Sequence, residues 1–286
     1  MLYVELVVQG LVLGCIYALI AVGLTLVYGL LRVLHVAHAG LFTLGGYIGV
    51  LLTNATGSLF LSMVVAAIVV GILGMAIYRL CYHPLLERPP FVALIASIGL
   101  FIAMEEIYRL VFGPYGLSYV DPPLQQIVTL FGMNMKAAEI AVVAIVALSV
   151  VALHMLSTRT RIGTAWRASV TEPEMAQSFG VDIVRVRYLN FFIASALAAI
   201  AGVMVALLNN LVEPTMGSVP SYKALAIIVL GGLGNVRGTL VASLLLGVLE
   251  SLGTIYVGFL LDRDAIAFVF LIIVLMIRPQ GLFGKV

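Results

Sequence analysis

Long apolar runs separated by short polar interruptions make up most of this chain of 286 residues. Several of the runs approach or exceed the roughly 20 residues with which an α-helix crosses a bilayer. The pattern therefore predicts an all-α fold, a polytopic transmembrane helical bundle of about eight or nine spans. The expected spans cover residues 4–31, 41–52, 59–78, 91–112, 137–156, 188–211, 222–230, 240–261 and 265–277.

Two of these runs are short and interrupted or followed by glycine. The run at 41–52 contains Gly45 and Gly46, and the run at 222–230 is followed by Gly231 and Gly232. Such segments are typical of broken or re-entrant helices near a translocation path. Each half of the chain has a long span rich in Gly and Ala, a polar break, and a short span ending among glycines. We interpret this correspondence as a candidate internal repeat, which would place the path between the repeats near mid-membrane.

The composition indicates an integral membrane protein. Hydrophobic residues make up 63% of the chain and charged residues 10%, whereas about a quarter of a soluble domain is charged. A net charge of +2 is too small to indicate a nucleic-acid partner. Cys15 and Cys81 have no CxxC spacing, so neither a disulfide framework nor a metal site is indicated. The chain contains neither a Walker-type phosphate loop nor a Gly-x-Ser-x-Gly sequence, and no catalytic site is predicted.

The longest polar interruption, residues 158–187, separates an N-terminal half, 1–157, from a C-terminal half, 188–286, within one membrane domain, 1–286. With this loop in the cytoplasm, eleven basic residues lie inside and four outside, as the positive-inside rule requires. The N-terminus is then expected outside and the C-terminus in the cytoplasm. The inside residues are Arg159, Arg161, Arg167, Arg185 and Arg187 of the loop, with Arg32, Arg79, Arg88, Arg237, Arg278 and Lys285; those outside are Arg109, Lys136, Lys223 and Arg263.

The loop contains the signals of a short helix. Thr171 and Glu174 have the spacing of a capping box, which satisfies the free backbone donors of a first helical turn. Pro173 suits that first turn, and Gly180 suits its end, where the left-handed conformation is common. Met175 and Phe179 are four residues apart and share a face with the small Ala176. Such a helix is suited to docking into a groove on another protein; the alternative is an ordinary basic loop that touches nothing.

Several polar side chains fall within or between the spans. His35 and His38 are three residues apart, and hydrogen bonding at the break between two spans is favoured over a metal site, since no carboxylate or thiol accompanies them. Glu105 and Arg109 are four residues apart and are expected to form a pair. Glu250 lies inside a span, where hydrogen bonding to neighbouring helices is favoured over proton coupling. The glycines from Gly231 to Gly234 are expected to permit a sharp turn and close helix contact.

Several stretches resemble the permeases of binding-protein-dependent ABC importers for branched-chain amino acids. The loop sequence Glu174-Met175-Ala176-x-x-x-Gly180 resembles a Glu-Ala-Ala-x-x-x-Gly loop that in this family sits in a cleft on the ATPase subunit. The other matching residues extend over nearly the whole chain: Gly14, Tyr17, Ala18, Gly23, Tyr28, Gly29, His38, Ser97, Gly99, Gly163, Arg167, Lys223, Gly231, Gly234, Gly238, Gly247, Glu250 and Arg278.

The resemblance implies a permease subunit that translocates branched-chain or other hydrophobic amino acids across a bacterial-type inner membrane. Its implied partners are a second related permease, as heterodimer or homodimer, two cytoplasmic ATPase subunits and an extracytoplasmic binding protein. ATP and Mg would be bound by the ATPases, with no cofactor in this chain. Alternatives are a urea or short-amide permease of the same family and a self-contained ion-coupled secondary transporter. The ATPase-coupling residues are expected to be Arg167, Thr171, Glu174, Met175, Ala176, Phe179 and Gly180, and the substrate path is expected to include His38, Gly45, Gly46, Ser97, Gly231 and Gly232.

Overall fold

The computed structural model describes residues 2–130, 133–256, 258, 262–278 and 280–283. Lys285 therefore lies outside the described residues, as does the side chain of Arg263. The elements are α1 (Leu2–Leu31), α2 (His38–Thr56), α3 (Leu59–Ile77), η1 (Tyr78–Tyr82), η2 (His83–Leu85), α4 (Pro90–Phe112), β1 (Ile127–Leu130), β2 (Met133–Lys136), α5 (Ala137–Arg159), α6 (Arg161–Thr171), α7 (Pro173–Ser178), α8 (Ile183–Asn209), α9 (Ser218–Gly231), α10 (Val236–Tyr256) and α11 (Arg263–Ile277).

The prediction of an all-α polytopic membrane protein is confirmed. In the described part of the chain, seven helices are long and apolar enough to cross a membrane: α1, α2, α3 with its π and 3-10 extension, α4, α5, α8 and α10. Two further apolar helices, α9 and the part of α11 from Asp264 to Ile277, are shorter. Helices suit this setting because each satisfies its own backbone hydrogen bonds where lipid offers none.

Two long helices, α1 and α8, form the centre of the bundle and pack in a reciprocal way. α1 of the N-terminal half packs chiefly on α10 and also on α9, whereas α8 of the C-terminal half packs on α2 and α3. Glycines allow these contacts, because a Cβ on Gly247 would overlap the backbone of Gly10 and Gly14. Close approach of this kind is the usual source of helix association in lipid.

The short broken span predicted at 41–52 is wrong. α2 is one continuous helix of 19 residues, His38–Thr56. Its glycines are packing positions, since a Cβ on Gly45 would overlap the backbone of Ala199 in α8, and one on Gly46 would lie 2.8 Å from the Met216 side chain. The other predicted short span is confirmed as α9, which has 14 residues.

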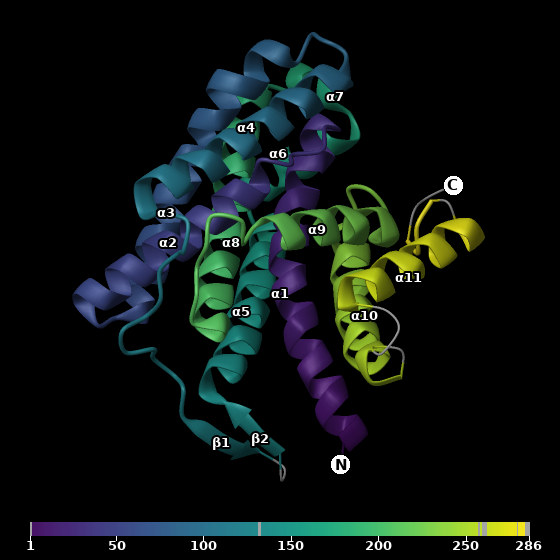
Figure 1. The fold of residues 1–286 in the computed structure, drawn as a ribbon. Helices are drawn as coiled ribbons and strands as arrows, with labels where there is room; N and C mark the ends of the chain where they lie inside the picture. The colour runs from purple at the N-terminus through teal and green to yellow at the C-terminus, as the bar shows by residue number, and fades with distance from the viewer. Residues whose placement is uncertain (1, 131–132, 257, 259–261, 279, 284–286) are drawn as a thin grey trace.

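The two ends of the bundle differ in structure (Figure 1). The N-terminus and the hairpin of β1 and β2 lie at one end, and α6 and α7 lie at the other. The hairpin is antiparallel, with Ile127 opposite Lys136, and it was not predicted from the sequence. Its strands have only four residues each, too short to stand out from a neighbouring apolar span by periodicity.

Candidate functional site

Two consecutive helices, α6 and α7, form the polar end of the bundle where a single short helix was predicted. Thr160 caps α6 by accepting a hydrogen bond from the Gly163 backbone N–H at 3.0 Å. Pro173 occupies the first turn of α7, and Gly180 takes a φ of +83° after it, both as predicted.

The predicted capping box is wrong, because Thr171 belongs to the end of α6 and not to the start of α7. Its hydroxyl donates to the Arg167 carbonyl oxygen at 3.0 Å. The N-cap of α7 is Glu172, and no side chain caps this helix. Glu174 stands in its first turn, where a carboxylate complements the helix dipole.

An apolar groove of about 600 Å³ runs between α6 and α7. Met175 is 59% exposed and Phe179 84% exposed, whereas Ala176 at the base is buried. Large apolar side chains exposed together at a polar end indicate a contact with another protein. The groove is lined by Arg161, Thr164, Ala165, Ala168, Thr171, Glu172, Met175, Ala176, Phe179 and Val181.

Of the seven predicted coupling residues, Thr171, Met175, Ala176 and Phe179 line this groove. Arg167, Glu174 and Gly180 do not. Arg167 lines a separate cavity that is formed with α1, α5 and α10. α6 thus presents two faces to two different hollows.

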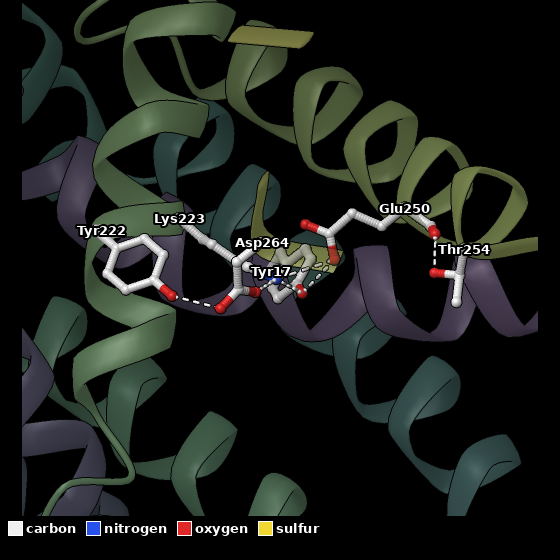
Figure 2. A network of polar contacts seen from close by, with 6 residues as sticks. All are labelled: Tyr17, Tyr222, Lys223, Glu250, Thr254 and Asp264. Carbon is white, nitrogen blue, oxygen red and sulfur yellow. Dashed lines mark hydrogen bonds and ion pairs between the residues drawn. The ribbon is translucent and has the colours of Figure 1, made fainter. Parts of the chain in front are cut away.

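A second polar site lies deep in the bundle, where Lys223 of α9 meets two carboxylates (Figure 2). Its Nζ lies 3.0 Å from Oε2 of Glu250 in α10 and 2.8 Å from Oδ1 of Asp264 in α11. The side chains of Lys223 and Glu250 are 3% and 0% exposed. A charge buried this deeply is stable only when it is paired.

Tyr17 of α1 completes this site. Its hydroxyl donates to Glu250 Oε2 at 2.8 Å and accepts a hydrogen bond from Lys223 Nζ at 2.8 Å. At the margin, the Tyr222 hydroxyl donates to Asp264 Oδ2 at 2.6 Å. We call Tyr17, Lys223, Glu250 and Asp264 the charge cluster; it ties α9 to α1, α10 and α11.

The charge cluster tests two predictions, one of which is wrong and one of which is confirmed. Lys223, predicted to lie on the outer side of the membrane, is instead buried among the helices. The predicted hydrogen bonding of Glu250 to neighbouring helices is confirmed. Local spacing could not reveal the cluster. The sequence offered one signal, which was the presence of the opposite charges Lys223 and Glu250 within apolar spans. Charged residues inside a membrane usually pair with one another.

A third polar site, which we call the histidine cluster, consists of His35, Tyr82 and Ser97. Tyr82 donates its hydroxyl proton to Ser97 Oγ at 2.7 Å, so its oxygen accepts from Nδ1 of His35. Ser97 Oγ also accepts the Ala37 backbone N–H at 3.0 Å. Burial, and then the nearby His38, lower the pKa of His35 well below its ordinary value, so this ring in the α1–α2 connection is neutral.

The predicted hydrogen bonding at the break between the first two spans is therefore confirmed for His35. The two histidines do not share a helix face, because α2 begins at His38. Their rings nevertheless meet edge to face, with centroids 5.6 Å apart. The predicted pair of Glu105 and Arg109 is wrong, since Arg109 binds Glu106 at 2.7 Å.

The predicted substrate-path residues are separated in the structure. His38 and Ser97 lie at the histidine cluster, and Gly45 and Gly46 lie on the packed face of α2. Gly231 and Gly232 end α9, where a Cβ on Gly231 would lie 2.5 Å from the Thr239 backbone nitrogen, and Gly232 has a φ of +95°. The predicted sharp turn and close contact are thus confirmed. None of the six lines the α6–α7 groove or the cavity beside Arg167. Their place on the path stays a prediction.

The opposite end of the bundle carries two polar cavities of about 310 and 280 Å³, which share Gln9 and Glu139. Glu5 and Lys136 add a carboxylate and an ammonium group to their walls. The α6–α7 end is thus mainly apolar in its groove, whereas this end offers charges of both signs.

Comparison with known proteins covers nearly the whole chain. Residues 6–277 match the family described as branched-chain amino acid transport system, permease component. The chain is 30% identical over 296 residues to the high-affinity branched-chain amino acid transport system permease protein LivH of Escherichia coli K12, covering 99% of this chain and 96% of LivH. It is 31% identical over 300 residues to the corresponding protein BraD of Pseudomonas aeruginosa, with 99% and 96% covered.

A more distant relative and a solved structure extend the comparison. The E. coli K12 permease protein LivM of the same transport system is 26% identical over 309 residues, covering 94% of this chain and 68% of LivM. Among solved structures, PsaBC from Streptococcus pneumoniae in complex with Fab has a TM-score of 0.53 and covers 96% of this chain and 92% of its own. At 11% identity, that likeness is one of fold.

Proposed function

Because the chain belongs to the family of branched-chain amino acid transport permease components, we propose that it forms half of a membrane pathway for a hydrophobic amino acid, driven by separate ATPase subunits. Its partners in this proposal are a second related permease, two cytoplasmic ATPases and an extracytoplasmic binding protein. The relatives LivH and LivM, named as permease proteins of one transport system, support the pairing of two permeases.

The observation that carries the proposal is the apolar groove between α6 and α7. Met175 and Phe179 expose large apolar surfaces at the polar α6–α7 end of the bundle, beside the buried Ala176. An ATPase surface that covers these side chains would remove them from water, which favours association. Movement of the ATPases would then act on the two helices, and through α5 and α8 on the spans.

We place the α6–α7 end in the cytoplasm and the β1–β2 hairpin outside. Arg159, Arg161, Arg167, Arg185 and Arg187 all lie in or next to α6 and α7, at one end of the bundle. Cytoplasmic loops carry the excess of basic residues. In this orientation the two polar cavities near Gln9 face the binding protein.

Replacement of Phe179 by Glu tests the docking groove. A carboxylate in an apolar contact is costly to desolvate, so ATPase co-purification and amino acid uptake should fall at least about tenfold. Gln177→Glu is the matched control, because Gln177 is exposed on the same helix and does not line the groove. Equal uptake by the two variants, with equal amounts in the membrane, would contradict the proposed docking.

Reconstitution distinguishes this proposal from a self-contained carrier. The purified chain alone in liposomes should show no uptake of leucine under an ion gradient, and uptake should require the second permease, the ATPases and the binding protein with ATP. Gradient-driven uptake by the chain alone would instead establish a secondary transporter.

A further inference from the structure

We propose that the cavity between α1, α5, α6 and α10 binds an anionic glycerophospholipid, with its phosphate at Arg167 and Arg237 and an acyl chain on the apolar wall. The cavity has a volume of about 430 Å³. It shares no lining residue with the groove that we assign to the ATPase, since α6 contributes Trp166 and Arg167 to this cavity and other residues to the groove. An ATPase that contacts only the groove's lining residues leaves this cavity free.

The polar mouth of the cavity carries positive charge without a negative counterpart. Arg167 comes from α6, and Arg237 comes from the first turn of α10. His154 of α5 also lines the cavity. Neither arginine forms an ion pair with a carboxylate in the described part of the chain. Arginines on two different helices around one hollow match a phosphate group, which guanidinium groups bind well.

The rest of the wall is apolar and extends into the depth of the bundle. Val22 lies nine residues before the end of α1 at Leu31, roughly 14 Å along the helix axis at 1.5 Å per residue. Val150 of α5 and Leu240 of α10 face the same hollow. A site with a cationic mouth at the membrane surface and an apolar wall below it matches the two ends of a phospholipid. A free phosphate ion would leave the wall unused.

Titration of the purified full-length chain in detergent, followed by native mass spectrometry, tests the site directly. We expect phosphatidylglycerol to bind in preference to phosphatidylcholine, which has the same chains but no net charge. Arg167→Gln with Arg237→Gln should weaken phosphatidylglycerol binding roughly thirtyfold, since each arginine near an anionic surface contributes a factor of about five to six in affinity.

The matched control is Arg79→Gln with Arg159→Gln, which removes the same charge from two exposed arginines that lie outside the cavity and form no ion pair in the described part of the chain. It should leave the affinity within about twofold of the wild type. Val151→Trp keeps both arginines and fills the apolar wall, and it should weaken lipid binding while inorganic phosphate binding stays unchanged.

Four outcomes would overturn the proposal. The first is an equal loss in the two arginine pairs, which would indicate general surface attraction. The second is equal affinity for the two lipids, which would indicate an apolar groove alone. The third is displacement of the lipid by inorganic phosphate or glycerophosphoglycerol at equal concentration, which would indicate an anion site. The fourth is a cross-link from Val151→Cys to a second permease in the assembled complex, which would indicate a protein contact.

Discussion

The histidine cluster lies in the N-terminal half of the chain, and the charge cluster, apart from Tyr17, lies in the C-terminal half; the two use different chemistry. In the N-terminal half, His35 and Ser97 join the start of α2 to α4. In the C-terminal half, Lys223 and Asp264 join the first half of α9 to the start of α11. The first contact is a chain of neutral hydrogen bonds, and the second is a buried set of ions.

This difference determines how much stability each half loses when a single residue of its cluster is replaced. A neutral hydrogen bond contributes about 0.5–1.5 kcal/mol, and losing one leaves a dipole unsatisfied. Removing one partner of a buried ion pair leaves an uncompensated charge, at a cost of about 3–5 kcal/mol. The C-terminal half should therefore be the more sensitive to single substitutions, although not necessarily the more stable.

The largest effect is expected from Lys223→Met. It leaves the carboxylates of Glu250 and Asp264 without their ammonium partner, and the free energy of unfolding in detergent should fall by about 3–5 kcal/mol. The double variant Lys223→Met with Glu250→Met removes both fully buried charges and should recover part of this loss. If the losses measured for Lys223→Met and Glu250→Met alone simply added in the double variant, the two side chains would not be energetically coupled.

The membrane fold was largely predictable because a transmembrane helix is specified by its own residues. The runs at 91–112 and 137–156 correspond to α4 and α5 within a few residues. The error at α2 has a physical cause. In a soluble helix, glycine is destabilising and suggests a break. In α2, Gly45 and Gly46 instead leave room for α8 and the Met216 side chain to pack closely against the helix.

The functional sites also differ in whether residues close in sequence or far apart in sequence specify them. Pro173 and Gly180 marked α7 because caps and stops depend on nearby residues. Thr171 was misassigned because it is the last residue of α6, the preceding helix, where its hydroxyl donates to the Arg167 carbonyl oxygen. Lys223 could not be matched to Tyr17 by spacing, since 206 residues separate them in the sequence. Such a pairing depends on the whole fold.

Glu250→Gln should have the second-largest effect. The amide keeps the shape and can still accept from Tyr17, while Lys223 retains Asp264 at 2.8 Å. The loss is then that of one charged hydrogen bond, about 1.5–3 kcal/mol, measured by chemical denaturation in detergent. A loss as large as that of Lys223→Met would mean that Asp264 does not compensate the ammonium group.

Tyr82→Phe tests the neutral half with a smaller expected loss, about 1–2 kcal/mol. It removes the donor to Ser97 and the acceptor for His35, both buried. Tyr47→Phe is the control, because the Tyr47 hydroxyl is buried without a hydrogen-bond partner in the described part of the chain. Tyr47→Phe should be neutral or slightly stabilising, and equal losses in the two variants would exclude a specific role for the histidine cluster.

The smallest effect is expected from Tyr222→Phe, at the edge of the charge cluster. The Asp264 side chain is 32% exposed, so water can replace the lost donor to Oδ2. The free energy of unfolding should therefore fall by less than about 1 kcal/mol. This loss is smaller than that expected for Tyr82→Phe, even though the hydrogen bond removed here has a charged acceptor. Tyr115→Phe, at a side chain that is 91% exposed, provides the baseline. If Tyr222→Phe instead lowered the free energy of unfolding as much as Glu250→Gln does, Asp264 would be shielded from water in the folded protein. Solvent exposure would then not explain a difference in strength between the hydrogen bonds of Glu250 and those of Asp264.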